Sequence, residues 1–273
     1  MSAADRLNRV LAQGRRVVHV SVERAQGSTP REAGAAMLVL ETGEIAGTIG
    51  GGALEWEAQR LAGKMFEPGA PSLMRHDMAL GPELAQCCGG RMALRFELLT
   101  PADVARAAEL AREPDLTPLA LFGAGHVGRA LVLALAPLPF SIRWIDARAA
   151  IFPDAVPAHV TKIAPLDPAA EIAGLAPNSF VLVMTHSHPL DLDIVARALM
   201  AGSFPFVGLI GSLTKRRRFE KRLAEAGVPG RAMDQLVCPV GIEGIEGKEP
   251  ATIAASMAAR LLIARERFLE TCA

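Results

Sequence analysis

The sequence predicts an α/β protein of two domains, the second of them a doubly wound parallel sheet. Its length, 273 residues, favours two domains over one. A glycine-rich turn between an apolar strand and an amphipathic helix begins only at residue 123, so the residues before it are numerous enough for a separate domain. Short apolar strands then recur with helical stretches between them, and this alternation is typical of a parallel sheet.

The second domain opens with a strand at Pro118–Phe122, followed by a tight turn and a helix. The turn follows the pattern G-x-G-x-x-G, in which backbone amides and the start of a helix face a pyrophosphate. The next strand, Phe140–Ile145, ends in Asp146, whose carboxylate is suited to a pair of ribose hydroxyls. These elements in this order predict a Rossmann fold. The three glycines are Gly123, Gly125 and Gly128.

Three further strands are expected at Ala158–Ile163, Phe180–Met184 and Phe206–Ile210. A basic helix follows the last of them, and a glycine-rich loop containing Lys248 leads into a long helix over Ala251–Leu269. Because ligands bind at the carboxyl ends of parallel strands, the segments that follow these strands are candidate site segments.

The segment after Phe180–Met184 carries His186 and His188, with Asp191 as a candidate helix cap. We expect these side chains to form a polar lining of the ligand cleft. A His-x-His pair followed by carboxylates also resembles the start of a metal site, as in a metal-dependent hydrolase. No later histidine supplies the further ligands that such a site needs.

The first domain is expected over residues 1–100, with strands at Val17–Val22, Ala36–Leu40 and Glu44–Ile49. Two polar, glycine-rich segments follow strands of this domain. The loop at residues 26–34 contains Gly27, Ser28, Thr29 and Arg31. The run Gly50, Gly51 and Gly52 leads into a helix that begins near Ala53. Consecutive glycine amides form an anion-binding nest, so we predict a phosphate or ligand cradle here.

Cys87 and Cys88 stand beside Gly89, Gly90 and Arg91. Neighbouring cysteines are poor disulfide partners, whereas two thiols in a glycine turn can bind a soft metal or a sulfur-bearing ligand. The nearby guanidinium would lower the pKa of a thiol. The alternative is a pair of small buried side chains at the start of a strand.

A helix from Thr100 to about Arg112 and a linker at residues 113–115 separate the two domains. We therefore divide the chain into residues 1–100, a helix and linker at 101–116, and a Rossmann-like domain at 117–273.

Charge and cysteine content exclude several classes of protein. Basic and acidic residues number 29 each, so the net charge gives no reason to expect nucleic acid or a membrane as partner. The amphipathic N-terminus lacks the apolar core of a signal peptide, and no apolar run has the length of a membrane span. Four cysteines without a disulfide framework indicate the cytoplasm.

Seven segments taken together resemble the xanthine dehydrogenase accessory protein family (XdhC, related to CoxI). They are GSTPREAGAAMLV, GTIGGGALE, QCCGGR, LFGAGHVGRAL, THSHPLDLDI, GLIGSLTKRRRF and PVGIEGIEGKEPATIAASMAARLL. The resemblance covers nearly the whole chain, with an N-terminal XdhC/CoxI domain of mixed α/β structure and a C-terminal Rossmann domain.

This resemblance implies a chaperone that binds molybdenum cofactor (molybdopterin), assists its sulfuration and delivers it to apo xanthine dehydrogenase. The implied partners are the molybdenum-binding subunit of that enzyme and a cysteine desulfurase, and we expect a homodimer. No residue is assigned a catalytic role, and Cys87 and Cys88 are the candidate metal ligands. The residues expected to bind the cofactor are Gly27, Ser28, Thr29, Arg31, Gly50, Gly51, Gly52, Glu55, Cys87, Cys88, Gly123, Gly125, His126, Gly128, Asp146, His186, His188 and Lys248.

The alternative is an NAD(P)-dependent oxidoreductase that uses the Rossmann domain. The chain contains no tyrosine to act as an acid, and no obvious catalytic residue pairs with Asp146. The sequence leaves open whether the Rossmann cleft holds a dinucleotide, the pterin or nothing.

Overall fold

The computed structural model describes residues 3–80, 89–110 and 116–272. The chain divides into two compact units, Met1–Glu113 (unit 1) and Pro114–Ala273 (unit 2). Within the described ranges, no helix is both long enough and apolar enough to cross a membrane.

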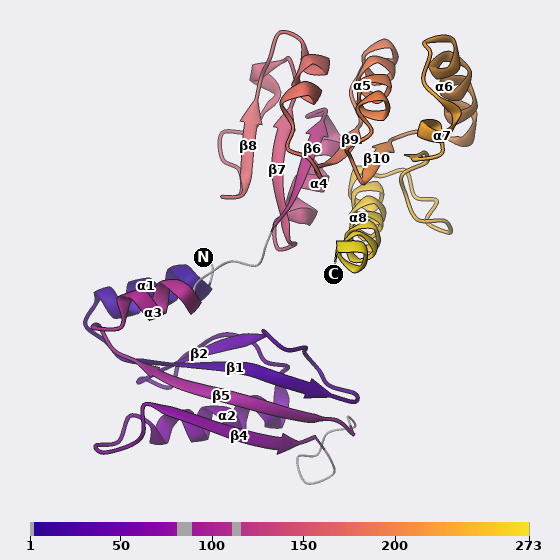
Figure 1. Ribbon diagram of the computed structural model, residues 1–273. Helices are drawn as coiled ribbons and strands as arrows, with labels where there is room; N and C mark the ends of the chain where they lie inside the picture. The colour runs from indigo at the N-terminus through magenta and orange to yellow at the C-terminus, as the bar shows by residue number, and fades with distance from the viewer. Residues whose placement is uncertain (1–2, 81–88, 111–115, 273) are drawn as a thin grey trace. The chain divides into compact units, whose positions relative to one another are not determined.

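Unit 1 is built on an antiparallel sheet of five strands in the order β3-β2-β1-β5-β4 (Figure 1). The central strand β1 pairs with β2 and β5, so that Val17 lies opposite both Leu40 and Leu99. The register between β1 and β5 shifts between Val22 and Arg24. The strands are β1 (Val17–Gln26), β2 (Ala36–Leu40), β3 (Ile45–Gly47), β4 (Leu73–Ala79) and β5 (Arg91–Leu99).

The two faces of this sheet are covered differently. Side chains alternate along β1, so Val18 and Val20 point to a core that contains Leu54 of α2, while Val17 points to a smaller core with Leu7 and Ala107. We call the face opposite α2 the outer face. It carries polar residues where neither α1 nor α3 packs on it. The helices of unit 1 are α1 (Ala3–Ala12), α2 (Gly52–Lys64) and α3 (Val104–Leu110).

Unit 2 contains a parallel sheet of six strands in the order β11-β10-β9-β6-β7-β8 (Figure 1). Chain order reverses between β6 and β9, so their carboxyl ends form the switch point at which such sheets bind ligands. The expected Rossmann fold is confirmed. The strands are β6 (Thr117–Phe122), β7 (Phe140–Ile145), β8 (Val160–Ile163), β9 (Phe180–Val183), β10 (Phe206–Leu209) and β11 (Leu236–Val237).

Helices cover both faces of this sheet. One core joins Phe122 and Val183 to Ile194 of α5 and Phe219 of α6. The other joins the opposite face to Leu131 of α4 and to α8. The helices are α4 (His126–Leu135), α5 (His188–Ala201), α6 (Leu213–Glu225), α7 (Gly230–Met233) and α8 (Pro250–Cys272), with short 3₁₀ turns η2 (Ala149–Ile151) and η3 (Pro168–Gly174).

Several elements differ from the sequence-based expectation. Strand β1 continues beyond Val22 to Gln26, and β4, β11 and α7 were not predicted. The structure corrects the assignment of Asp191 as a helix cap, because α5 is capped by Ser187, whose hydroxyl accepts a hydrogen bond from the Leu190 amide.

Candidate cofactor site

Three glycine-bearing segments meet at one end of the sheet in unit 1. A Cβ atom on Gly90 would lie 2.4 Å from the carbonyl oxygen of Ser28, and one on Gly27 would lie 3.3 Å from Cα of Gly90. A Cβ on Gly50 would lie 2.5 Å from Cγ of Pro30. Glycine is therefore required for these close approaches. The structure brings together the loop after β1, the turn before α2 and the start of β5, which are far apart in sequence.

The glycine run before α2 surrounds an internal carboxylate. Oε1 of Glu55 accepts hydrogen bonds from the hydroxyl of Thr48 and from the amides of Ile49 and Gly50, the last two at 2.9 and 3.3 Å. Burial tends to raise the pKa of this carboxyl, but the hydrogen bonds outweigh it and lower the pKa below its usual value. The nest at this turn thus already holds an anion, so an external phosphate would compete with Glu55 for these amides.

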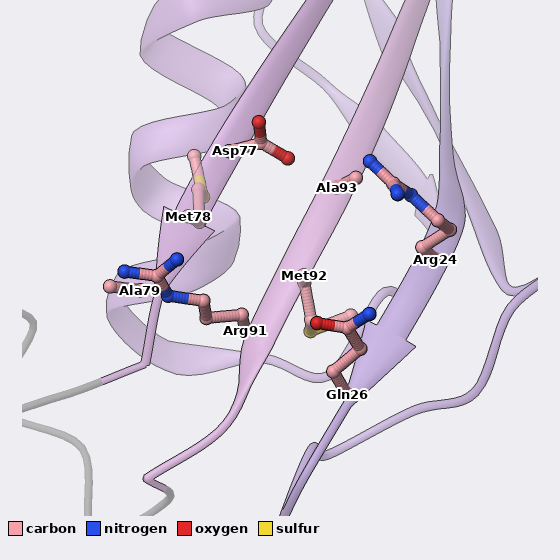
Figure 2. Close-up of a pocket in the computed structure, with 8 residues that line it drawn as sticks. All are labelled: Arg24, Gln26, Asp77, Met78, Ala79, Arg91, Met92 and Ala93. Atoms are coloured by element: carbon pink, nitrogen blue, oxygen red, sulfur yellow. The ribbon is translucent and has the colours of Figure 1, made fainter.

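Beside these loops, a shallow pocket of about 290 Å³ opens on the outer face of the sheet. Ala93 of β5 lies opposite Arg24 of β1 on one side and opposite Asp77 of β4 on the other. In the next row, Arg91 lies opposite Gln26. Figure 2 shows Arg24 and Asp77 on either side of β5 at the level of Ala93, whose small side chain leaves room between them.

The arginines of this pocket differ from their neighbours in their ion pairs. Arg75 donates to Glu23, and both Arg95 and Arg106 donate to Glu97. Within the parts of the chain that the structure describes, no carboxylate pairs with the pocket's two arginines, at positions 24 and 91. Guanidinium groups bind phosphate and other oxyanions well, and the carboxylate of the pocket accepts N–H donors. The pocket can thus hold a ligand that carries both an anionic group and an N–H group.

Sequence reasoning missed Arg24, Gln26 and Asp77. The signal that could have found Arg24 and Gln26 is their spacing of two residues, which places both on one face of a strand. This signal was hidden because β1 was predicted to end at Val22, whereas it continues to Gln26. None of the predicted loop residues Gly27, Ser28, Thr29 and Arg31 lines the pocket, and Arg31 is exposed.

Cys87 and Cys88 lie outside the described residues. Among the residues that are described, no group of three or more histidine, cysteine or acidic side chains is arranged to hold a metal ion. The hydrolase alternative based on His186 and His188 therefore gains no support from the structure.

In unit 2 the glycine turn lies directly against the loop that follows β9. A Cβ on Gly123 would lie 2.3 Å from the carbonyl oxygen of Met184, and one on Gly128 would lie 2.2 Å from that of Gly123. The indole Nε1 of Trp144 donates to the same Gly123 carbonyl at 3.0 Å. These contacts fix the turn at the switch point. Gly125 has open space around its Cα, which leaves the turn accessible to a ligand.

Asp146 lies where predicted, but its carboxylate is already engaged. Its Oδ2 accepts from the amide of Ala124 at 2.9 Å, and Arg148 donates to both carboxylate oxygens through Nε and Nη2. Burial would raise the pKa of Asp146, yet these hydrogen bonds lower it to about 2. A ribose would have to share this carboxylate with Arg148.

The remaining predicted residues of unit 2 are exposed. His126 begins α4, His186 and His188 flank the cap of α5, and Lys248 precedes α8.

Asp191 of α5, in contrast, is fully buried and accepts hydrogen bonds from Thr185 and Lys215. The ring of His188 lies edge-on to Phe219, with the centroids 6.5 Å apart.

Comparison with known proteins agrees with this architecture. Residues 119–261 match the XdhC Rossmann domain, and residues 10–77 match the XdhC and CoxI family. The uncharacterized protein YqeB of Escherichia coli (strain K12) is 30% identical over 244 residues, which cover 87% of this chain and 41% of YqeB. The chain thus spans about two fifths of the length of that relative.

A crystal structure of a xanthine dehydrogenase from Bacillus halodurans superimposes with a TM-score of 0.78 at 21% identity. The match covers 98% of this chain and 96% of that one. At this identity the likeness shows a common fold.

Proposed function

The chain belongs to the XdhC and CoxI family, and from this premise we propose that it serves the maturation of xanthine dehydrogenase. In this proposal it binds molybdenum cofactor, assists its sulfuration and delivers it to the apo enzyme in the cytoplasm, without turning over a substrate of its own. Its partners are then the molybdenum-binding subunit of xanthine dehydrogenase and a cysteine desulfurase, and it acts as a homodimer.

The observation that carries this proposal is the pocket on the outer face of unit 1. The cofactor is a pterin that bears a dithiolene and a phosphate. Two arginines without carboxylate partners among the described residues suit its phosphate, and Asp77 suits the amino and ring N–H groups of a pterin. The loop residues Gly27 and Ser28 lie at the same end of the sheet, next to Gly90.

A carrier must also release its cargo. Its affinity for the cofactor should therefore be lower than that of the target enzyme by a few kcal/mol, since each ~1.4 kcal/mol is a factor of ten.

The test mixes cofactor-loaded protein with apo xanthine dehydrogenase and follows xanthine oxidation, with free cofactor at equal concentration as the control. We expect faster and longer-lasting activation by the loaded protein, and a further gain when cysteine desulfurase and cysteine are added. Equal activation by free cofactor would contradict delivery.

The thiols are tested by elemental analysis of bound molybdenum and in the same transfer assay. We propose that Cys87 or Cys88 contacts the molybdenum or the sulfur being transferred. The double variant Cys87→Ser/Cys88→Ser should bind less molybdenum, as measured by elemental analysis, whereas Cys272→Ser, which alters an exposed free thiol, should bind as much as the unaltered protein. Full binding and transfer by the double variant would make the thiol pair structural.

An NAD(P)-dependent oxidoreductase is the second candidate, and the strand order of unit 2 with its open Gly125 turn favours it. Calorimetric titration with NAD⁺, NADP⁺ and their reduced forms tests it. Binding that is lost in Gly125→Val, together with turnover of a hydroxy or amino substrate, would support this candidate over the chaperone.

A further inference from the structure

A second, larger groove of about 830 Å³ lies on unit 2 along α6, and its described lining includes no residue of the glycine turn. It begins where β10 ends and follows one face of the helix. Its apolar floor is formed by the half-buried Ile210 and the edge of Phe219, which is 3% exposed, and His188 of α5 stands at its rim. The cationic side chains that line it are Lys215, Arg218, Lys221 and Arg222.

The cations of α6 fall into two groups. Lys215 is neutralised by Asp191 and also donates to the carbonyl of Ile210, and Arg216 is paired with Glu220. Arg218, Lys221 and Arg222 are exposed, and the structure pairs none of them with a carboxylate among the residues that it describes. Arg217 is also exposed and is paired with no carboxylate of the described chain, but it does not line the groove; of the exposed cations of α6, Arg218, Lys221 and Arg222 are those that face it.

The unpaired cations are arranged along the helix. Residues three and four apart share a helix face, so Arg218, Lys221 and Arg222 form one stripe, which ends at Glu225, the only carboxylate of the groove lining in the described chain. At a rise of about 1.5 Å per residue, the stripe from 218 to 225 is roughly 10 Å long. Because the whole chain is neutral, this is a local concentration of charge.

We propose that this groove binds an acidic segment of a partner protein. Carboxylates of the segment face Arg218, Lys221 and Arg222, and its apolar side chains lie on Ile210 and Phe219. A single small anion would leave most of the stripe and all of the apolar floor uncovered, whereas a peptide of alternating acidic and apolar residues covers both. This assignment is independent of the cofactor pocket of unit 1.

The experiment uses the full chain and a fluorescein-labelled twelve-residue peptide of alternating Glu and Leu, with fluorescence anisotropy at about 50 mM salt as the readout. A peptide with Gln in place of Glu is the charge control. Arg218→Glu/Arg222→Glu should weaken binding at least about tenfold, since it reverses two charges that face the groove. Arg217→Glu is the matched control, because Arg217 is exposed on the same helix but does not line the groove.

Binding of the acidic peptide that falls with salt, is lost in the double variant and persists in Arg217→Glu supports the proposal. An equal loss in Arg217→Glu, or no preference for the Glu peptide over the Gln peptide, overturns it. Displacement of the peptide by an equal concentration of inorganic pyrophosphate also overturns it, in favour of a small-anion site. Arg218→Gln/Arg222→Gln replaces the reversal variant if the latter fails to fold, as judged by circular dichroism.

Discussion

Lys215 of α6 and Asp191 of α5 form an ion pair that is almost fully withdrawn from solvent. Nζ lies 2.8 Å from Oδ2, and the two side chains are 14% and 0% exposed. The other oxygen of Asp191 accepts from the amide and hydroxyl of Thr185. One carboxylate therefore joins the loop after β9, the first turn of α5 and the first turn of α6.

Removing the cation of this pair should destabilise unit 2 strongly. Lys215→Met leaves the Asp191 carboxylate buried without its partner, for which we expect a loss of about 3–5 kcal/mol in the free energy of unfolding. Urea denaturation followed by Trp144 fluorescence measures it in a Trp56→Phe background, because the chain has only these two tryptophans and Trp56 belongs to unit 1.

Arg216→Met is the matched control for that experiment. Its pair with Glu220 is 35% and 40% exposed, so the change should cost less than about 1 kcal/mol. Equal stability of the Lys215 and Arg216 variants would show that the buried pair adds nothing to unit 2.

Replacement by alanine should cost far more stability at Gly123 than at Gly125 of the same turn. Gly123 has φ +115°, and its Cβ would collide with the Met184 carbonyl, so Gly123→Ala should cost more than about 3 kcal/mol or prevent folding. Gly125 has φ −69° and open space, so Gly125→Ala should change stability by less than about 1 kcal/mol. The Trp144 urea assay compares them, and similar losses in both would contradict the close approach of Gly123 to the Met184 carbonyl.

The buried ion pair and the glycine turn of unit 2 illustrate what the sequence can and cannot predict. The pattern of glycines with flanking apolar strands identified the turn of unit 2, because that pattern is local. It did not reveal that Arg148 engages Asp146, or that Lys215 of a helix interpreted as basic surface pairs with a buried Asp191. Lys215 and Asp191 are 24 positions apart and meet only in the folded sheet, whereas Arg148 stands two positions from Asp146 and reaches it through the local course of the backbone after β7.

In unit 1, too, the sequence predicts individual segments but not which of them meet in the fold. The glycine loops were recognised individually, but their meeting at one end of the sheet depends on β5 lying beside β1, a pairing between residues about seventy positions apart. Without the register of β5 against β1 and β4, the sequence does not show that Arg24 and Asp77 lie on either side of Ala93. Nor does a run of three glycines indicate that Glu55 will accept hydrogen bonds from the amides of Ile49 and Gly50 at this turn.

Cofactor binding in the pocket should depend on Arg24 and Arg91. Under the proposed function, Arg24→Ser/Arg91→Ser should weaken binding of molybdenum cofactor at least about tenfold, because two charge-assisted contacts to its phosphate are lost. Elemental analysis of bound molybdenum after equilibrium dialysis measures this. Arg75→Ser is the control on the same sheet, since Arg75 is held by Glu23 outside the pocket. Equal retention by both variants would place the phosphate elsewhere.

His19 should make unit 1 sensitive to mild acid. Burial lowers the pKa of this imidazole from 6.5 to about 4; Glu97 opposes that effect, and Arg106 and Arg95 add to it. Between pH 6.5 and 4 the unfolded chain binds a proton that the folded chain does not. The free energy of unfolding therefore falls as the pH falls through this window, by roughly 2–3 kcal/mol, and this contribution levels off below pH 4.

The comparison of wild type with His19→Gln isolates that effect. Urea unfolding by circular dichroism between pH 7 and 4.5 should show a smaller decline for the variant, while unit 2 contributes equally to both proteins. Carboxyl groups whose pKa values are lowered in the folded state, such as those of Asp146 and Glu55, are present in both proteins, so their titration contributes to both declines. Parallel declines in the two proteins would rule out His19 as the cause.

The packing of α8 has a consequence for the order in which the nascent chain can fold on the ribosome. One face of the unit 2 sheet is closed by Met257 and Leu261 of this helix, and Arg265 donates to the hydroxyl of Thr117 in the first strand of that sheet. The sheet of unit 1 is complete at Leu99, so it can form early in translation. Until α8 has been synthesised, the part of this face that α4 does not cover stays open to solvent, so we expect unit 2 to need more protection from aggregation than unit 1 during that interval.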